Sequence, residues 1–191
     1  MNFFNFLRKF RDDERGSLAI ETVLIFPILC WAYLATFVYF DAFRIQSTTN
    51  KAAYTISDQV SRETGYITPT YMTSLYNLHE FLTSSNHPTK LRLSIVRFTT
   101  KDGYEVRWSQ GRGGAGALNA AGLADILDKL PVMPDNEVII VVQNWLSYEP
   151  MFSVGLKAFE FENLIVTRPR FNSAQLCWNS VENGGVTTAT C

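Results

Sequence analysis

Residues 17–40 read SLAIETVLIFPILCWAYLATFVYF and carry a single charge, that of Glu21. A helix needs about 20 residues to cross the roughly 30 Å hydrocarbon core of a bilayer, and this run is long enough. A helix in the core of a soluble domain normally keeps a polar stripe over such a length, whereas this run is apolar on all sides. The stretch therefore predicts a membrane-spanning helix.

The flanks of the run predict its orientation. Basic residues cluster before it and are sparse after it: Arg8, Lys9, Arg11 and Arg15 precede it, and Arg44 and Lys51 follow. An excess of Lys and Arg marks the cytoplasmic side of a span, so residues 1–16 are expected to form a cytoplasmic leader. A secretory signal peptide has a shorter apolar region, usually about 7–15 residues, followed by a small-residue cleavage site that is missing here. The chain is thus expected to be a single-pass protein with its C-terminal part outside the cytoplasm.

Composition narrows the function further. The chain has 191 residues, 47% of them hydrophobic, and a formal net charge of −1. That content is enough for one folded domain with a core. A nucleic-acid partner is not expected, because phosphate binding depends on a surplus of Lys and Arg. Two histidines and three scattered cysteines offer little for a metal site, and we expect no cofactor.

Glu21 is the unusual residue of the apolar run. A carboxylate in hydrocarbon costs a few kcal/mol, so it either reaches water at the interface or has a function. The segment Arg15-Gly16-Ser17 is followed by Glu21, five positions after the glycine. This arrangement resembles the processing site of type IV pilin-like proteins. In that family a membrane peptidase cuts after the glycine, and the glutamate at the fifth mature position guides assembly.

Three segments indicate which family of pilin-like proteins the chain resembles. Residues 14–27 (ERGSLAIETVLIFP) include Pro27, residues 141–150 read VVQNWLSYEP, and residues 167–171 read TRPRF. Together they resemble the TadE/TadG-like family of tight-adherence (Flp) pili. The resemblance implies a structural, non-enzymatic pseudopilin or assembly component of the bacterial inner membrane, able to enter an extracellular pilus. It also implies cleavage by prepilin peptidase between Gly16 and Ser17. The implied partners are other pilin-like subunits and the inner-membrane assembly machinery.

The chemistry of the run suits assembly. An amine on a mature Ser17 would lie one helical turn from Glu21, and opposite charges attract strongly at low dielectric. In a filament the amine of one subunit can meet the carboxylate of a neighbour instead. Pro27 leaves the carbonyl of Val23 without its helical donor, a break that membrane helices tolerate when neighbours repair it.

The rest of the chain predicts a stem and a head. Residues 41–64 continue the helix as a stem, with Ile45, Thr49, Ala53, Ile56 and Val60 at steps of three and four. Residues 65–191 form the head. Helices are predicted over residues 71–82, on the stripe Met72, Leu75, Leu78 and Leu82, and over residues 117–130.

Strands are predicted over residues 91–99, 104–109, 138–142 and 161–167, the first two joined by the Asp102-Gly103 turn. The run of residues 138–142 is apolar throughout, which predicts a central strand covered on both faces. The expected fold is α+β and pilin-like: a long N-terminal helix, then a four-stranded, mainly antiparallel sheet with helices on one side.

Several possible sites are weak. Residues 111–116 match the G-x-G-x-x-G pattern, but Glu137 opens the next strand instead of ending it, so a flexible loop is preferred to a dinucleotide site.

His79 and His87 are expected at the surface. Cys177 and Cys191 are expected to pair in an oxidising compartment, with two free thiols as the alternative. Cys30 is interpreted as a small apolar residue.

Two functions remain. The first is the pseudopilin or assembly component described above. The alternative is a single-pass periplasmic ligand-binding module whose helix serves only as an anchor. An assembly role makes Glu21 necessary, whereas an anchor should tolerate its loss.

Overall fold

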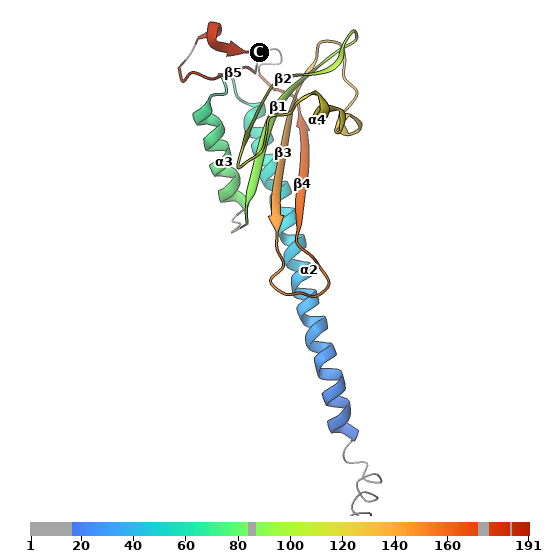
Figure 1. Ribbon diagram of the computed structural model, residues 1–191. Helices are drawn as coiled ribbons and strands as arrows, with labels where there is room; N and C mark the ends of the chain where they lie inside the picture. The colour runs from blue at the N-terminus through green and yellow to red at the C-terminus, as the bar shows by residue number, and fades with distance from the viewer. Residues whose placement is uncertain (1–16, 84–86, 172–175, 184) are drawn as a thin grey trace, which may run out of the picture. The chain divides into compact units, whose positions relative to one another are not determined.

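The computed structural model describes residues 17–83, 87–171, 176–183 and 185–191 (Figure 1). The predicted leader, with Gly16, lies outside the described residues. Two compact units are distinguished. One consists of the described residues up to Ala42 together with Pro150–Lys157, and the other of Phe43–Glu149 and Ala158–Cys191.

The long helix α2 (Ser17–Ser61) confirms the predicted continuous helix and ends close to the predicted stop. Pro27 lies inside it. The helix combines two kinds of sequence. Its first part is apolar on all sides, whereas its last part buries only one face, formed by Thr49, Ala53, Ile56 and Val60.

The head contains the predicted four-stranded antiparallel sheet, and its strand order is β2-β1-β3-β4 (Figure 1). They are β1 (Thr89–Thr99), β2 (Gly103–Arg112), β3 (Val138–Tyr148) and β4 (Phe159–Thr167). The predicted hairpin between β1 and β2 is confirmed. Gly103 has a φ of 75°, a conformation that glycine adopts without strain and that this tight turn requires.

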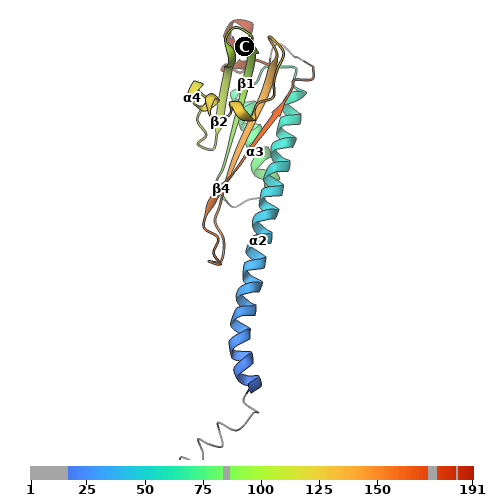
Figure 2. The ribbon, with the colours of Figure 1, turned by 90° about the vertical axis from the view of Figure 1, so that its right-hand side faces the viewer.

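One face of the sheet packs against α2 and the helix α3 (Pro69–Thr83), as Figure 2 shows. Ile56 and Val60 of α2 and Met72 of α3 share a core with inward side chains of all four strands, among them Leu93 and Ile140. The four central residues Ile139–Val142 are fully buried on both faces of β3, which confirms the predicted central strand. Helices α2 and α3 therefore form the predicted helical layer.

The opposite face is covered as well, which the prediction of helices on one side omitted. Leu123, Ile126 and Leu130 pack there against Ile139 and Val141. The single helix predicted over residues 117–130 is wrong. The chain instead forms α4 (Ala120–Ala124) and a 3-10 turn η2 (Leu127–Lys129). Three apolar side chains of this broken segment still reach the same sheet.

The C-terminal tail adds a small second sheet that was not predicted. Strands β5 (Trp178–Asn179) and β6 (Ala189–Thr190) pair antiparallel, with the 3-10 turn η3 (Val186–Thr188) before β6. Trp178 also bridges Ile67, at the start of the head. The tail is therefore part of the folded head.

Candidate functional site

The first part of α2 displays large apolar side chains on every side. More than half of the surface of each of these residues is exposed: Ile20, Val23, Leu24, Ile25, Phe26, Ile28, Leu29, Trp31, Tyr33, Phe37 and Phe40. By length and composition this helix can cross a membrane. Exposing so many apolar side chains to water is strongly unfavourable, so this part of α2 needs lipid or another apolar surface around it.

Glu21 lies in this apolar surface and is exposed. No hydrogen bond or ion pair joins its carboxylate to another of the described residues. Ser17, four residues before it, is in the same helix one turn away. Pro27 lies six residues after Glu21 and leaves the Val23 carbonyl without its usual donor. The carboxylate and the carbonyl are thus two polar groups that a neighbouring chain can satisfy.

A buried polar cluster joins the stem, α3 and the sheet. Asn144 of β3 donates from its Nδ2 to the carbonyl oxygen of Thr49 (3.0 Å) and lies 2.9 Å from Nε2 of His79. Its Oδ1 accepts from Asn163 of β4 (3.1 Å). One amide therefore connects two helices and two strands. Since it is fully buried, losing any partner would leave a polar atom unsatisfied.

The predicted surface position of His79 is wrong, because its side chain is fully buried. The buried stripe of α3 is formed by Met72, Leu75, His79 and Thr83, so the histidine occupies a core position. Burial lowers the pKa of His79 to about 4. The neutral ring lets Nε2 accept from the Asn144 amide, a role that a protonated ring cannot fill. His87 contacts the edge of the Tyr148 ring, with ring centroids 5.8 Å apart.

The segment of residues 167–171 holds the end of α2. The backbone N–H of Arg170 donates to the carbonyl of Ser61 (2.8 Å), which is one of the last carbonyls of the helix. The Arg170 guanidinium pairs with Asp58 (2.8 Å), one turn earlier. Arg168 pairs with Glu137 (2.7 Å) at the start of β3. The two arginines of this segment therefore fix the stem and the sheet to the chain that leaves β4.

A second group of polar side chains connects β1, β3 and β4. Gln143 accepts two hydrogen bonds from Arg92 through its Oε1, at 2.9 and 2.7 Å. The same guanidinium lies 4.9 Å from the ring centroid of Trp145. Lys90 pairs with Glu160 at 2.8 Å. These side chains lie on the face of the sheet that carries α4, beyond the segment that α4 covers.

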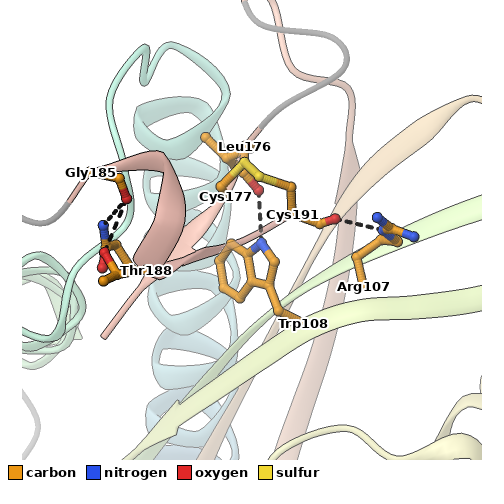
Figure 3. Close-up of a disulfide and its surroundings, with 8 residues drawn as sticks. Arg107, Trp108, Leu176, Cys177, Gly185, Thr188 and Cys191 are labelled. Atoms are coloured by element: carbon orange, nitrogen blue, oxygen red, sulfur yellow. Dashed lines mark hydrogen bonds between the residues drawn. A yellow bond between two sulfur atoms is a disulfide. The ribbon is translucent and has the colours of Figure 1, made fainter. Parts of the chain in front are cut away.

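The disulfide between Cys177 and Cys191 is present and closes the tail on itself, as predicted (Figure 3). Hydrogen bonds hold both of its ends to β2. Trp108 donates from its indole nitrogen to the carbonyl of Leu176 (2.7 Å), and Arg107 donates to the carbonyl of Cys191 (2.6 Å). Cys30 is a free thiol, exposed on the apolar part of α2.

The tail also holds the start of α3. The backbone N–H of Thr70 donates to the Glu182 carboxylate (2.8 Å), and this bond lowers the pKa of Glu182. The N–H of Ile67 donates to the carbonyl of Cys177 (2.9 Å). The first turn of a helix has N–H groups without helical partners, and a carboxylate there satisfies one of them.

Two glycines of the segment of residues 111–116 lie very close to other parts of the backbone. A Cβ on Gly111 would lie 2.0 Å from the carbonyl oxygen of Ala115, and one on Gly113 would lie 2.3 Å from the carbonyl oxygen of Thr89. Gly113 also has a φ of 69°. The two glycines are thus explained by backbone contacts, without a phosphate.

Metal-binding groups do not gather in the part of the chain that the structure describes: no three His, Cys, Asp or Glu residues lie together as a site. A groove of about 460 Å³ lies between η2 and β4, with Leu164, Val166 and Lys129 among its lining residues. Arg168 also lines it and is already paired with Glu137.

No family model, no curated protein and no solved structure matches this chain. The chain's own residues are therefore the basis for its function. They place Glu21 and Pro27 on an exposed apolar helix, and Cys177 and Cys191 in a disulfide. The sequence did not predict that His79 and Asn144 form a buried pair. The position of Asn144 directly after a buried apolar run indicated that its amide is buried, but not which residue it contacts.

Replacing both tail cysteines by serine should lower the free energy of unfolding of the head by about 3 kcal/mol, the value expected for a loop of about 15 residues. Denaturant unfolding of the full chain in detergent, followed by tryptophan fluorescence, measures this change, since Trp108 and Trp178 lie 6.0 Å apart. The Cys30→Ser variant is the matched control and should unfold like the wild type. Equal stability of the double variant would contradict the role assigned to the disulfide.

The head should lose stability as the pH falls from about 6.5 to 4. His79 has a lowered pKa in the folded state, so in this window the unfolded chain binds more protons than the folded one, and acid favours unfolding. A shift from 6.5 to about 4 corresponds to a loss of up to about 3 kcal/mol. Denaturant unfolding at a series of pH values measures it.

The His79→Gln variant keeps an acceptor for Asn144 and should lose this part of the pH dependence, while His87→Gln should keep it. Identical pH dependence in the wild type and His79→Gln would show that His79 is not the titrating group.

Proposed function

We propose that this chain is a membrane-anchored pseudopilin or assembly component of a bacterial tight-adherence pilus, with a structural role and no catalytic one. The observation that carries the proposal is the helix α2. Within one continuous helix, an apolar surface with the single carboxylate Glu21 leads into a stem whose buried face belongs to the head. A subunit that must leave the membrane and pack into a fibre needs this combination.

The energetics of such a helix differ between lipid and filament. In lipid the apolar side chains gain nothing from contacting each other, because the acyl chains are equally apolar, and association depends on packing and polar contacts. Glu21 is the group able to set the register, by pairing with the Ser17 amine of a neighbouring subunit. In a filament surrounded by water, burial of the same apolar side chains becomes strongly favourable.

The proposed topology follows from charge and redox chemistry. The basic residues before α2 favour a cytoplasmic leader, and the head would then lie in the periplasm. The disulfide between Cys177 and Cys191 suits that oxidising compartment. Prepilin peptidase would cut between Gly16 and Ser17. The partners would be other pilin-like subunits and the assembly machinery of the inner membrane.

The second candidate is a single-pass periplasmic ligand-binding module. The groove beside β4 is the observation that favours it, because apolar side chains such as Leu164 and Val166 line it together with the cation of Lys129. In this alternative the helix is only an anchor, and Glu21 has no partner to recognise. The two candidates therefore differ in what a change at Glu21 does.

The mature chain should begin at Ser17. Intact mass measurement of protein purified from cells with active prepilin peptidase should show the loss of residues 1–16. The same protein from cells without the peptidase is the matched control and should retain them. A chain that keeps Met1 in the presence of the active enzyme would contradict processing and leave a plain anchor.

Glu21→Gln should preserve membrane insertion and the folded head but strongly reduce co-purification with pilin-like subunits from detergent-solubilised membranes. The substitution keeps the size of the side chain and removes the charge that pairs with a neighbour's amine. Glu149→Gln, at an exposed acidic residue of the head, is the matched control and should leave recovery unchanged. Undiminished recovery with Glu21→Gln would favour the ligand-binding alternative.

A further inference from the structure

The loop between β3 and β4 is unusually apolar for an exposed connection. Between Glu149 and Lys157 it reads PMFSVGL, with no charge. Met151 is 78% exposed, and Phe152 is exposed beside it. Loops at a water-facing surface are normally polar, so we expect an apolar environment around Met151 and Phe152.

The loop packs on the apolar part of α2. Val154 is buried in a small cluster with Ala35 and Val38, and Leu34 and Leu156 pack against it. Both segments belong to the same compact unit. The local backbone is tight, since the N–H of Val154 donates to the carbonyl of Phe152 (3.0 Å) and Gly155 has a φ of 98°.

The position of this contact along α2 indicates how deep the loop would lie in the membrane. Asp41 is the first charged residue after Glu21 and marks the end of the apolar run. Val38 and Ala35 precede it by three and six residues, which is about 4.5 and 9 Å at about 1.5 Å per residue. The loop therefore meets α2 on the membrane side of Asp41, at the depth where interfacial apolar segments lie, about 5–10 Å into the headgroup and acyl boundary.

We infer that the β3–β4 loop, Pro150–Lys157, inserts into the periplasm-facing interface of the bilayer beside α2 and forms a second membrane contact. The inference rests on the membrane anchoring that is part of the proposed function. Met151 and Phe152 enter the acyl boundary, and Lys157 stays with the headgroups. An irregular loop cannot lie in the hydrocarbon centre, because its backbone polar groups need water, and the interface supplies it.

Lipid is the occupant that the surface fits best. The apolar side chains of the loop continue the exposed apolar surface of α2, and Ser153 is the one polar side chain between Pro150 and Leu156. A docked protein segment would be expected to find charged side chains around its site, whereas residues 150–156 carry no charge. Two contacts with the bilayer, one by the helix and one by the loop, would also restrict rotation of α2 about its axis.

Fluorescence quenching on the full chain tests this inference. The protein carries Met151→Cys in a Cys30→Ser background, labelled with an environment-sensitive dye, in vesicles of phosphatidylethanolamine and phosphatidylglycerol with the head outside. Two matched positions are labelled in the same background: Ile28→Cys, 66% exposed on α2, and Val132→Cys, 93% exposed on the head. Brominated lipids report contact with acyl chains, and iodide reports contact with water.

Residue 151 should be quenched by brominated lipids like residue 28, and iodide should quench it several-fold less than residue 132. If residue 28 responds to lipid while residue 151 responds to iodide as residue 132 does, the loop inference is overturned and the anchor stands. If iodide reaches residues 28 and 151 alike, the anchoring itself is wrong, and with it the proposed function. Shielding of residue 151 from both quenchers would mean that protein covers the loop, which also overturns the inference.

Discussion

The structure depends on the apolar surface of the first part of α2. Most large apolar side chains from Ile20 to Phe40 are exposed, and surrounding such a surface with water is strongly unfavourable. The rest of the chain accommodates this constraint. The same helix continues to Ser61, and its last part forms the buried stem of the head.

The stem is held to the head by polar groups as well as by its apolar face. The Asn144 amide binds the Thr49 carbonyl and the His79 ring, and Arg170 holds the last turn through Ser61 and Asp58. These contacts give a physical role to residues 141–150 and 167–171. Buried polar contacts with so many partners favour one arrangement of stem and sheet over others, because every alternative leaves a donor or acceptor unsatisfied.

Elements with a strong local pattern could be predicted from the sequence. The apolar run, the three- and four-residue spacing of the stem and the Asp102-Gly103 turn each specify local structure, and α2 and the β1–β2 hairpin confirm them. The single helix predicted over residues 117–130 was wrong, because the apolar spacing of Leu123, Ile126 and Leu130 fits a helix face while the neighbouring Gly122 and Asp125 have low helix propensity. The predicted surface position of His79 was wrong because its partner Asn144 lies 65 residues away, and such a long-range contact leaves no local pattern in the sequence.

The central claim is that Glu21 and the apolar surface around it recognise another subunit in the membrane. A photoreactive amino acid at Leu24, one turn from Glu21 and exposed in the apolar surface, tests it most directly in native membranes. The account predicts crosslinks to pilin-like subunits, identified by mass spectrometry, that are lost when Glu21→Gln is added. Crosslinks to lipid alone, unchanged by Glu21→Gln, would contradict the account and reduce α2 to an anchor.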